Sequence, residues 1–386
     1  MSAPILLPER PESDDTRLWP GLSLFVGRLA GMLPALPRDT PLLIAGSWGA
    51  GKTTLLQALQ RQLGRDQCVW FEAWRHSSEP SLLSALVWTV WSQSPQTDSA
   101  ALFEQAWRIA NRPVPGDAPG PPLLSALSDA LSSLIRQQWP DEPPVIFVDD
   151  LDRCSPTATL ALLDQLRTLL TWGLPCRFVV AMDRDVLTGL LSTRFQGMGS
   201  YDGNRYLEKL FPLSFNVPLP QRREAAELVA GLLRELDGSD APTPAELEHR
   251  DALTMALSEP TFANPRLMKR CINRFRLVIH FEATGGPPPS IAPELDEDSD
   301  RVLARWIAAS ERWPRMRRML QEHTDTYWRQ LSEAVLSDCA TPGPEADLVL
   351  SERGARAWLR REIFSAPPSS LADYRAADLR LRRWGL

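Results

Sequence analysis

The sequence predicts a doubly wound α/β fold for its first 220 residues, followed by regions that contain only helices. Short apolar runs alternate there with longer helical patterns, and the runs are rich in β-branched and aromatic residues. Such runs are typical of a parallel sheet that helices bury on both faces. We therefore expect a five-stranded, mainly parallel sheet, with strands at 41–45, 68–71, 145–148, 178–181 and 213–217.

Two proline-rich segments divide the chain. Residues 113–122 hold five prolines and two glycines, too many for a helix or a strand, and predict an irregular insert in the α/β part. Residues 284–300 change from Pro and Gly to acidic residues and predict a linker. The expected organisation is an α/β core over 1–220, helices over 221–283, and a helical C-terminal region over 301–386.

Composition excludes several classes of protein. Of the 386 residues, 44% are hydrophobic and 23% are charged, which is ordinary for a soluble globular chain. No apolar run approaches the ~18 residues of a membrane span, and the N-terminus lacks the apolar segment of a secretory signal. Five cysteines without a CxxC pair and four scattered histidines predict neither a disulfide framework nor a zinc site, so we expect a reducing cytoplasm. A net charge of −6 argues against nucleic-acid binding through bulk charge.

Residues 46–53 (GSWGAGKT) match the phosphate-binding pattern G-x-x-x-x-G-K-[ST] between a predicted strand and a predicted helix. The glycines let successive backbone N–H groups point at phosphates, and the helix adds the positive end of its dipole. Lys52 is expected to contact the β- and γ-phosphates, and the Thr53 hydroxyl to bind Mg²⁺. Only three of the 42 basic residues are lysines, and a compact lysine suits this place better than a broad arginine. The expected nucleotide contacts are Gly46, Ser47, Trp48, Gly49, Ala50, Gly51, Lys52, Thr53 and Thr54.

The run 145–150 (VIFVDD) predicts the second half of the same site. Asp149 is expected to hold Mg²⁺, and Asp150 to orient or deprotonate the attacking water. A buried strand that ends in an acidic turn is the alternative for this run taken by itself. A further strand between the two motifs favours a P-loop NTPase of the RecA/AAA-like type. ATP is the expected nucleotide, because none of the three lysines follows an asparagine, as guanine recognition by Asn-Lys-x-Asp requires.

Six motifs, in family order over about residues 20–283, resemble the KAP family of P-loop NTPases. They are GSWGAGKT, FEAWR (71–75), DDLDRCSP (149–156), FVVAMDR (178–184), YLEK (206–209) and NPRLMKRCIN (264–273). The resemblance implies an AAA-related ATPase of the signal-transducing class, with a helical lid over 221–283. Bacterial relatives often occur in operons for antiviral defence. Several members insert membrane helices between the two Walker motifs, whereas this chain resembles a soluble member.

The resemblance also implies roles for basic residues. Arg184 would sense the γ-phosphate, with a surface arginine beside a helix cap as the alternative. Arg266 on the lid would be a second sensor, with a solvated helical charge as the alternative. Lys209 or Arg205 would act as a finger on a neighbour's nucleotide, which implies a homo-oligomer or a partner protein from the same operon. Arg153 is expected to pair with Asp152 or Asp149, if it only braces the turn.

Two further segments resemble elements of relatives or depart from them. Many members have asparagine where Glu72 stands, and a glutamate there is expected to repel Asp150 and to raise one of the two pKa values. Residues 25–28 (FVGR) resemble the element that packs on adenine in Orc-like AAA proteins, with a plain helix start as the alternative.

The C-terminal region is the basic part of an acidic chain. Residues 301–386 hold fifteen arginines against eleven acidic residues, a net charge of +4, and 301–318 interleave Trp306 and Trp313 with arginines. A surface for nucleic acid, with stacking tryptophans, is one interpretation. The favoured one is an amphipathic helix that buries Trp306, Ile307 and Met316.

The sequence thus predicts a Mg²⁺-dependent ATPase that acts as a conformational switch. An assembly scaffold that binds ATP with negligible turnover is the second hypothesis, and a DNA-binding motor accessory is the third.

Overall fold

The structure of the 386-residue chain is a computed structural model. It describes twelve stretches of the chain, and the remaining residues are outside this description. The stretches are 6–76, 82–95, 99–111, 121–171, 173–194, 203–237, 242–284, 299–322, 325–337, 349–351, 354–364 and 370–386.

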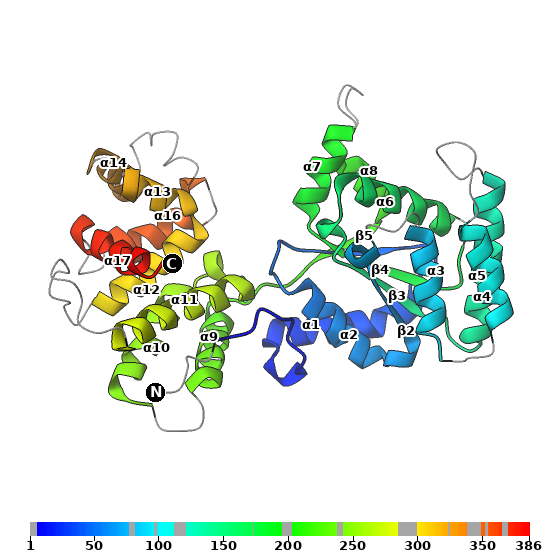
Figure 1. The fold of residues 1–386 in the computed structure, drawn as a ribbon, viewed down its shortest axis with the longest axis horizontal. Coiled ribbons are helices and arrows are strands. Elements are labelled where there is room, and N and C mark those ends of the chain that lie inside the picture. The colour runs from blue at the N-terminus through cyan, green and yellow to red at the C-terminus, as the bar shows by residue number, and fades with distance from the viewer. Residues whose placement is uncertain are drawn as a thin grey trace. The chain divides into compact units, whose positions relative to one another are not determined.

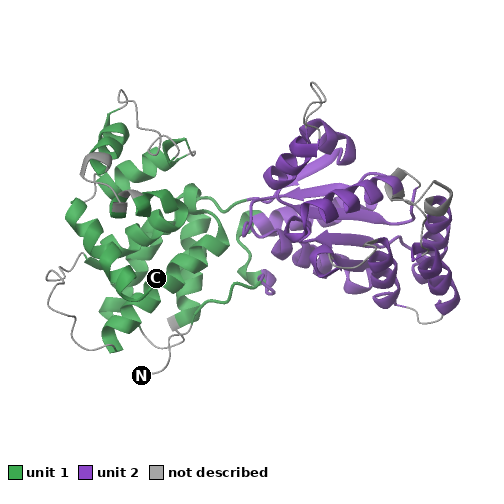
Figure 2. Ribbon diagram, turned by 45° about the horizontal axis from the view of Figure 1, so that its top comes forward, with its two compact units in different colours: residues 1–10, 16–21, 219–386 green, residues 11–15, 22–218 purple. Residues whose placement is uncertain are grey.

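The chain divides into two compact units, which are shown in different colours in Figure 2. We call residues 11–15 and 22–218 the sheet unit, and residues 1–10, 16–21 and 219–386 the helical unit. Each unit has its own hydrophobic core. We describe each unit by itself.

A five-stranded parallel sheet organises the sheet unit, in the order β2-β3-β4-β1-β5 (Figure 1). The predicted P-loop α/β fold is therefore confirmed. In space, β4 lies between the strand that precedes the phosphate loop and the strand that ends in Asp149. The strands are β1 (Leu42–Ala45), β2 (Cys68–Glu72), β3 (Val145–Asp149), β4 (Arg177–Met182) and β5 (Leu213–Asn216).

Helices cover both faces of this sheet because its central strands are apolar on both sides. Leu43, Val69, Ile146 and Val180 share one core with residues of α3, α5, α6, α7 and α8. Leu42 and Ile44, on the other face, are fully buried, and α1 and α2 lie on that side (Figure 1). The helices are α1 (Pro20–Met32), α2 (Lys52–Leu63), α3 (Leu82–Ser92), α4 (Ala100–Ala110), α5 (Pro121–Gln138), α6 (Pro156–Thr171), α7 (Arg184–Arg194) and α8 (Gly203–Leu210).

Among its described residues, the helical unit contains α-helices, a short π-helix and the 3₁₀ turn Pro260–Phe262. The longer elements are α9 (Arg222–Asp237), α10 (Pro244–Leu257), α11 (Pro265–Thr284), α12 (Ser299–Arg312), α13 (Pro314–Glu322), α14 (Asp325–Leu336), α16 (Ala355–Trp358), η7 (Leu359–Phe364) and α17 (Leu371–Arg383).

One core joins the parts of the helical unit that the sequence separates into a lid and a C-terminal region. Phe275 of α11, Trp306 of α12 and Tyr374 of α17 belong to the same buried cluster. The physical reason is that α12 is buried along most of its length. It therefore needs apolar partners both from helices that precede it in the chain and from helices that follow it. Most of the predicted linker, residues 285–298, and most of the predicted insert, residues 113–120, lie outside the described residues.

The packing interpretation of the basic C-terminal region is confirmed. Trp306, Ile307 and Met316 are buried, and so is Trp313, so these tryptophans offer no open face on which bases could stack. Several arginines of this region are used inside the unit. Arg305 pairs with Glu362, and Arg317 and Arg382 both pair with the buried Asp378.

Candidate nucleotide-binding site

The phosphate loop connects β1 to α2 and takes a conformation that requires glycine. Gly49 and Gly51 have φ values of 83° and 98°, in the left-handed region that side chains disfavour. A Cβ atom on Gly46 would lie only 3.3 Å from both Ala50 Cβ and Val217 Cγ2. The loop runs directly into the N-terminus of α2, where the helix dipole favours an anion. This local geometry is a cradle for phosphate groups.

Lys52 is held inside the loop by three oxygen atoms. Its Nζ donates to the carbonyl oxygens of Gly46 at 2.9 Å and Ser47 at 3.4 Å. It also forms an ion pair with Asp152 Oδ2 at 3.3 Å, and the two side chains are only 8% and 9% exposed. From the sequence, Asp152 is expected only to pair with Arg153, so its contact with Lys52 is a finding of the structure. The DDLD motif could have indicated this contact, because it places a third carboxylate one tight turn after the strand.

Two other loop positions are placed as follows. Trp48 is 55% exposed, although the resemblance singles it out. The hydroxyl of Thr54 accepts a hydrogen bond from the backbone N–H of Glu12 at 3.2 Å, within the sheet unit, so its side chain is engaged.

Asp149 and Thr53 form the oxygen pair that the sequence predicts for Mg²⁺. The Asp149 side chain is buried, accepts the Asp150 N–H at 2.9 Å, and hydrogen-bonds with Thr53. Burial raises its pKa to about 6, and the charge of Asp150 adds to the rise, while Thr53, the Asp150 N–H and Lys52 oppose it. When the ionised form of a carboxyl group is disfavoured in this way, a cation beside it stabilises that form.

The residues present fit a magnesium ion that is shared with a nucleotide. A hydroxyl and a carboxylate are hard oxygen donors, the kind that Mg²⁺ prefers, and this ion is usually held by one or two protein groups plus phosphates. In the part of the chain that the structure describes, no group of three or more His, Cys, Asp or Glu side chains could hold a metal. Thr53 and Asp149 would therefore need phosphate oxygens to complete the coordination.

Asp150 occupies a strained turn. With φ 56° and ψ 31°, it is the one non-glycine residue with a positive φ among those described, and it starts the short 3₁₀ turn Leu151–Arg153. Strain of this kind is often found at functional sites. Its carboxylate pairs with Arg153 Nε at 2.9 Å. Arg153 thus binds Asp150, rather than Asp152 or Asp149 as expected.

Glu72 lies opposite Asp149 in the strand register, and its carboxylate pairs with Arg75. The guanidinium carbons of Arg75 and Arg153 lie 5.9 and 6.0 Å from the ring centre of Trp74, at cation–π distance. Glu72 and Asp150 therefore each have an arginine partner. The raised pKa of Asp149 does not have Glu72 among its causes, and the expected repulsion between Glu72 and Asp150 stays a prediction.

The predicted sensor Arg184 is the first residue of α7, directly after β4 and at the same sheet edge as the loop. The preceding Asp183 accepts the N–H of Asp185 at 3.0 Å, so it caps this helix. Arg266 belongs to the helical unit, where its Nε lies 3.7 Å from Glu9 Oε2. Arg205 and Lys209 are exposed residues of α8. The sensing and finger roles stay predictions.

The segment 25–28 lies inside α1, not at its start. Val26 is fully buried, and the ring of Phe25 lies edge-on against Phe215 of β5 with centroids 5.7 Å apart. Adenine packing by this segment stays a prediction.

Two models of known families match parts of the chain. Residues 127–280 match the KAP family P-loop domain, and residues 19–180 match the AAA ATPase domain. The resemblance to the KAP family that the sequence motifs indicate is therefore confirmed by the first match. No curated protein sequence matches it.

Solved structures resemble this chain only distantly. A Walker-type ATPase of Pyrococcus abyssi is 14% identical, with a TM-score of 0.43 and coverage of 97% of this chain and 98% of that chain. A mutant RuvB of Thermotoga maritima is also 14% identical, with a TM-score of 0.36 and coverage of 92% and 89%. A DNA replication initiation factor is 13% identical, with a TM-score of 0.33 and coverage of 94% and 93%. The fold assignment rests on the sheet and the loop, and not on these scores.

Among the described residues, no helix combines the length and the apolar character that crossing a bilayer requires.

Proposed function

We propose that this chain is a Mg²⁺-dependent ATP hydrolase of the KAP family that uses the nucleotide as a conformational switch. The observation that carries the proposal is that one sheet edge gathers the phosphate loop, the Thr53–Asp149 oxygen pair and the strained Asp150. The carboxyl ends of parallel strands are where open α/β sheets bind ligands.

The residues would divide the work as follows. The backbone N–H groups of the loop and the Lys52 ammonium bind the phosphates, while Thr53 and Asp149 hold Mg²⁺. When bound, the ion neutralises charge on the phosphate oxygens. Asp150 orients the attacking water and accepts its proton, which requires its carboxylate to leave Arg153. The switch is the exchange of the Asp150–Arg153 and Lys52–Asp152 ion pairs for contacts with the nucleotide and the attacking water.

The scaffold hypothesis remains a second candidate because of one contact. The Asp150–Arg153 pair holds the candidate base, and a chain in which it never separates would bind ATP without turning it over. The DNA-binding hypothesis has less support, since the tryptophans on which it depends are buried.

The family resemblance supports a biological setting for this activity. In this proposal the chain acts in an antiviral defence system of bacteria. A second copy of the chain, or a partner protein from the same operon, supplies the finger residue that acts on a neighbour's nucleotide. The five cysteines, which include no CxxC pair, support a location in the reducing cytoplasm.

The test is steady-state ATP hydrolysis by the purified chain with Mg²⁺, beside Lys52→Ala. Turnover that disappears in the variant supports the proposal, and turnover that rises more steeply than protein concentration indicates a site completed between subunits. Tight ATP binding with no turnover favours the scaffold. Absence of ATP binding contradicts both.

A further inference from the structure

Asp152 is a buried charged group that the proposed mechanism leaves without a task. It lies in the 3₁₀ turn Leu151–Arg153, and its carboxylate reaches into the phosphate loop to Lys52, at 3.3 Å. Both side chains are almost completely excluded from solvent. The Coulomb attraction between two charges is stronger in such surroundings than at the surface.

The position of this pair conflicts with phosphate binding. In the structure, the Lys52 ammonium is directed at two loop carbonyls and the Asp152 carboxylate. An ammonium group has three donors, and these three oxygens can use all of them. For Lys52 to contact the β- and γ-phosphates, at least one of these partners must give way. The carboxylate is the partner that also repels the phosphate charge.

We propose that Asp152 is a positioning residue that holds Lys52 in the loop and competes with phosphate for its ammonium group. Asp152 thereby weakens nucleotide binding and lets the loop release its nucleotide. The inference rests on the proposed ATP binding, and it assigns to the third acid of the DDLD motif a role distinct from those of Asp149 and Asp150.

Removing the carboxylate should act on the free protein more than on the complex. Asp152→Asn leaves the buried ammonium without its anion until phosphate arrives, and breaking one side of a buried pair is strongly destabilising. Because the nucleotide restores an anion, the complex is spared this loss. By linkage, the difference appears as tighter binding, so the dissociation constant should fall about 10- to 100-fold.

The experiment measures ATP binding to the full chain by calorimetry, in EDTA, so that neither hydrolysis nor the metal pair contributes. Asp152→Asn is compared with the wild type and with Asp141→Asn, which removes the same charge from an exposed position before β3. The expected result is a 10- to 100-fold lower dissociation constant for Asp152→Asn and a change below twofold for Asp141→Asn. Asp152→Asn should also melt at a lower temperature than the wild type when free, and at a similar temperature with saturating ATP.

A Lys52→Met background separates positioning from a structural role of the turn. If Asp152 acts through Lys52, the double variant should bind ATP no better than Lys52→Met by itself. A gain that persists there, or an unchanged or higher dissociation constant in the single variant, overturns the inference. If Asp152→Asn does not fold, Asp152→Ser is tested in the same way, and Asp152→Glu should keep the affinity within a few-fold of the wild type.

The outcomes also separate this inference from the proposed function. Wild-type binding that Asp152→Asn leaves unchanged contradicts only the competition. Absence of binding in both the wild type and the variant contradicts the proposed function and this inference together.

Discussion

Two aspartates, one in each unit, have pKa shifts of opposite direction: Asp149 is fully buried and Asp300 is half-buried. Asp149 in the sheet unit has its pKa raised to about 6, first by burial and then by the charge of Asp150. Burial alone would raise the pKa of Asp300 in the helical unit too, but hydrogen bonds and charges from His249 and Arg380 hold it below its usual value. The surroundings therefore disfavour the ionised form of Asp149 in the sheet unit and favour the ionised form of Asp300 in the helical unit.

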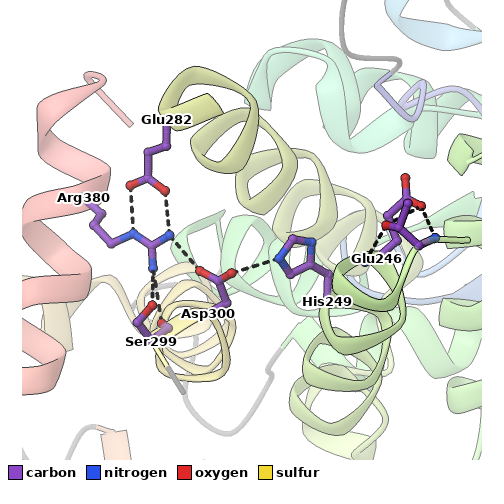
Figure 3. Close-up of polar contacts among 7 residues, drawn as sticks. Glu246, His249, Glu282, Ser299, Asp300 and Arg380 are labelled. Atoms are coloured by element: carbon purple, nitrogen blue, oxygen red, sulfur yellow. Dashed lines mark hydrogen bonds and ion pairs between the residues drawn. The ribbon is translucent and has the colours of Figure 1, made fainter. Parts of the chain in front are cut away.

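Figure 3 shows how the support for Asp300 is built. His249 Nε2 lies 2.9 Å from one of its oxygens, and Arg380 donates to the other at 2.8 Å. Arg380 also binds both oxygens of Glu282, at 2.9 and 2.6 Å, and the carbonyl of Ser299 at 3.3 Å. The network joins α10, α11, α12 and α17, so its charges fasten helices together.

The acids around the phosphate loop are compensated less well, because at Asp149 burial and the charge of Asp150 outweigh the groups that favour its ionised form. Asp149, Asp150 and Asp152 lie close together at one strand end, where Lys52 pairs with Asp152 and Arg153 pairs with Asp150. The comparison teaches that compensated buried charge stabilises a fold, whereas uncompensated buried charge marks a place that awaits a ligand.

The largest expected effect is on activity, at the uncompensated site. Asp150→Asn should lower turnover about 10²- to 10⁴-fold, because an amide cannot accept the proton from water. Stability should change little, since asparagine tolerates the left-handed backbone of this position. Steady-state hydrolysis and melting temperature check both parts. Turnover equal to that of the wild type would show that Asp150 is not the base.

Arg380→Met should have the largest effect on stability, at the compensated site. It leaves the half-buried Glu282 and Asp300 without their cation, so we expect a loss of about 3 kcal/mol, the lower end of the range for broken buried pairs. Urea unfolding followed by tryptophan fluorescence measures it, with Arg375→Met, at an exposed position of the same helix, as control. Equal losses in the two variants would mean that the network is not what holds the helix.

Asp149→Asn should stabilise the free protein at pH 8, by up to about 3 kcal/mol, since two pKa units correspond to this energy. The sign follows from a folded pKa above the unfolded one: ionisation costs stability above about pH 6 and costs nothing below about pH 4. Melting temperatures from pH 8 to pH 4 should converge between variant and wild type. A constant difference would rule out titration as the cause. ATP binding and hydrolysis by the variant should also no longer respond to Mg²⁺.

Asp300→Asn should show the opposite sign and a smaller size, a loss of about 1–2 kcal/mol at pH 7. Its folded pKa is depressed, so its contribution is present above the ordinary value and disappears as the pH falls through the lowered one. Melting curves at pH 7 and pH 3 test this. Turnover should be unaffected, and a stabilised variant at pH 7 would contradict the comparison.

Much of the fold could be predicted because it depends on local patterns. All five strands lie where apolar β-branched runs indicate them, and the phosphate loop lies between its strand and helix, since glycine spacing and periodicity act over a few residues. Burial of Trp306 and Ile307 could be predicted for the same reason, from helical spacing.

The tertiary structure decided which charged groups meet. The sequence determined that Asp149, Asp150 and Asp152 follow one strand, but only packing brought Asp152 to Lys52, which lies 100 residues earlier, and Arg153 to Asp150. It also joined α11, α12 and α17 around one core. Periodicity states which side of an element is apolar, whereas the partner of a buried charge depends on distances between elements, and these are fixed only when the whole core is packed.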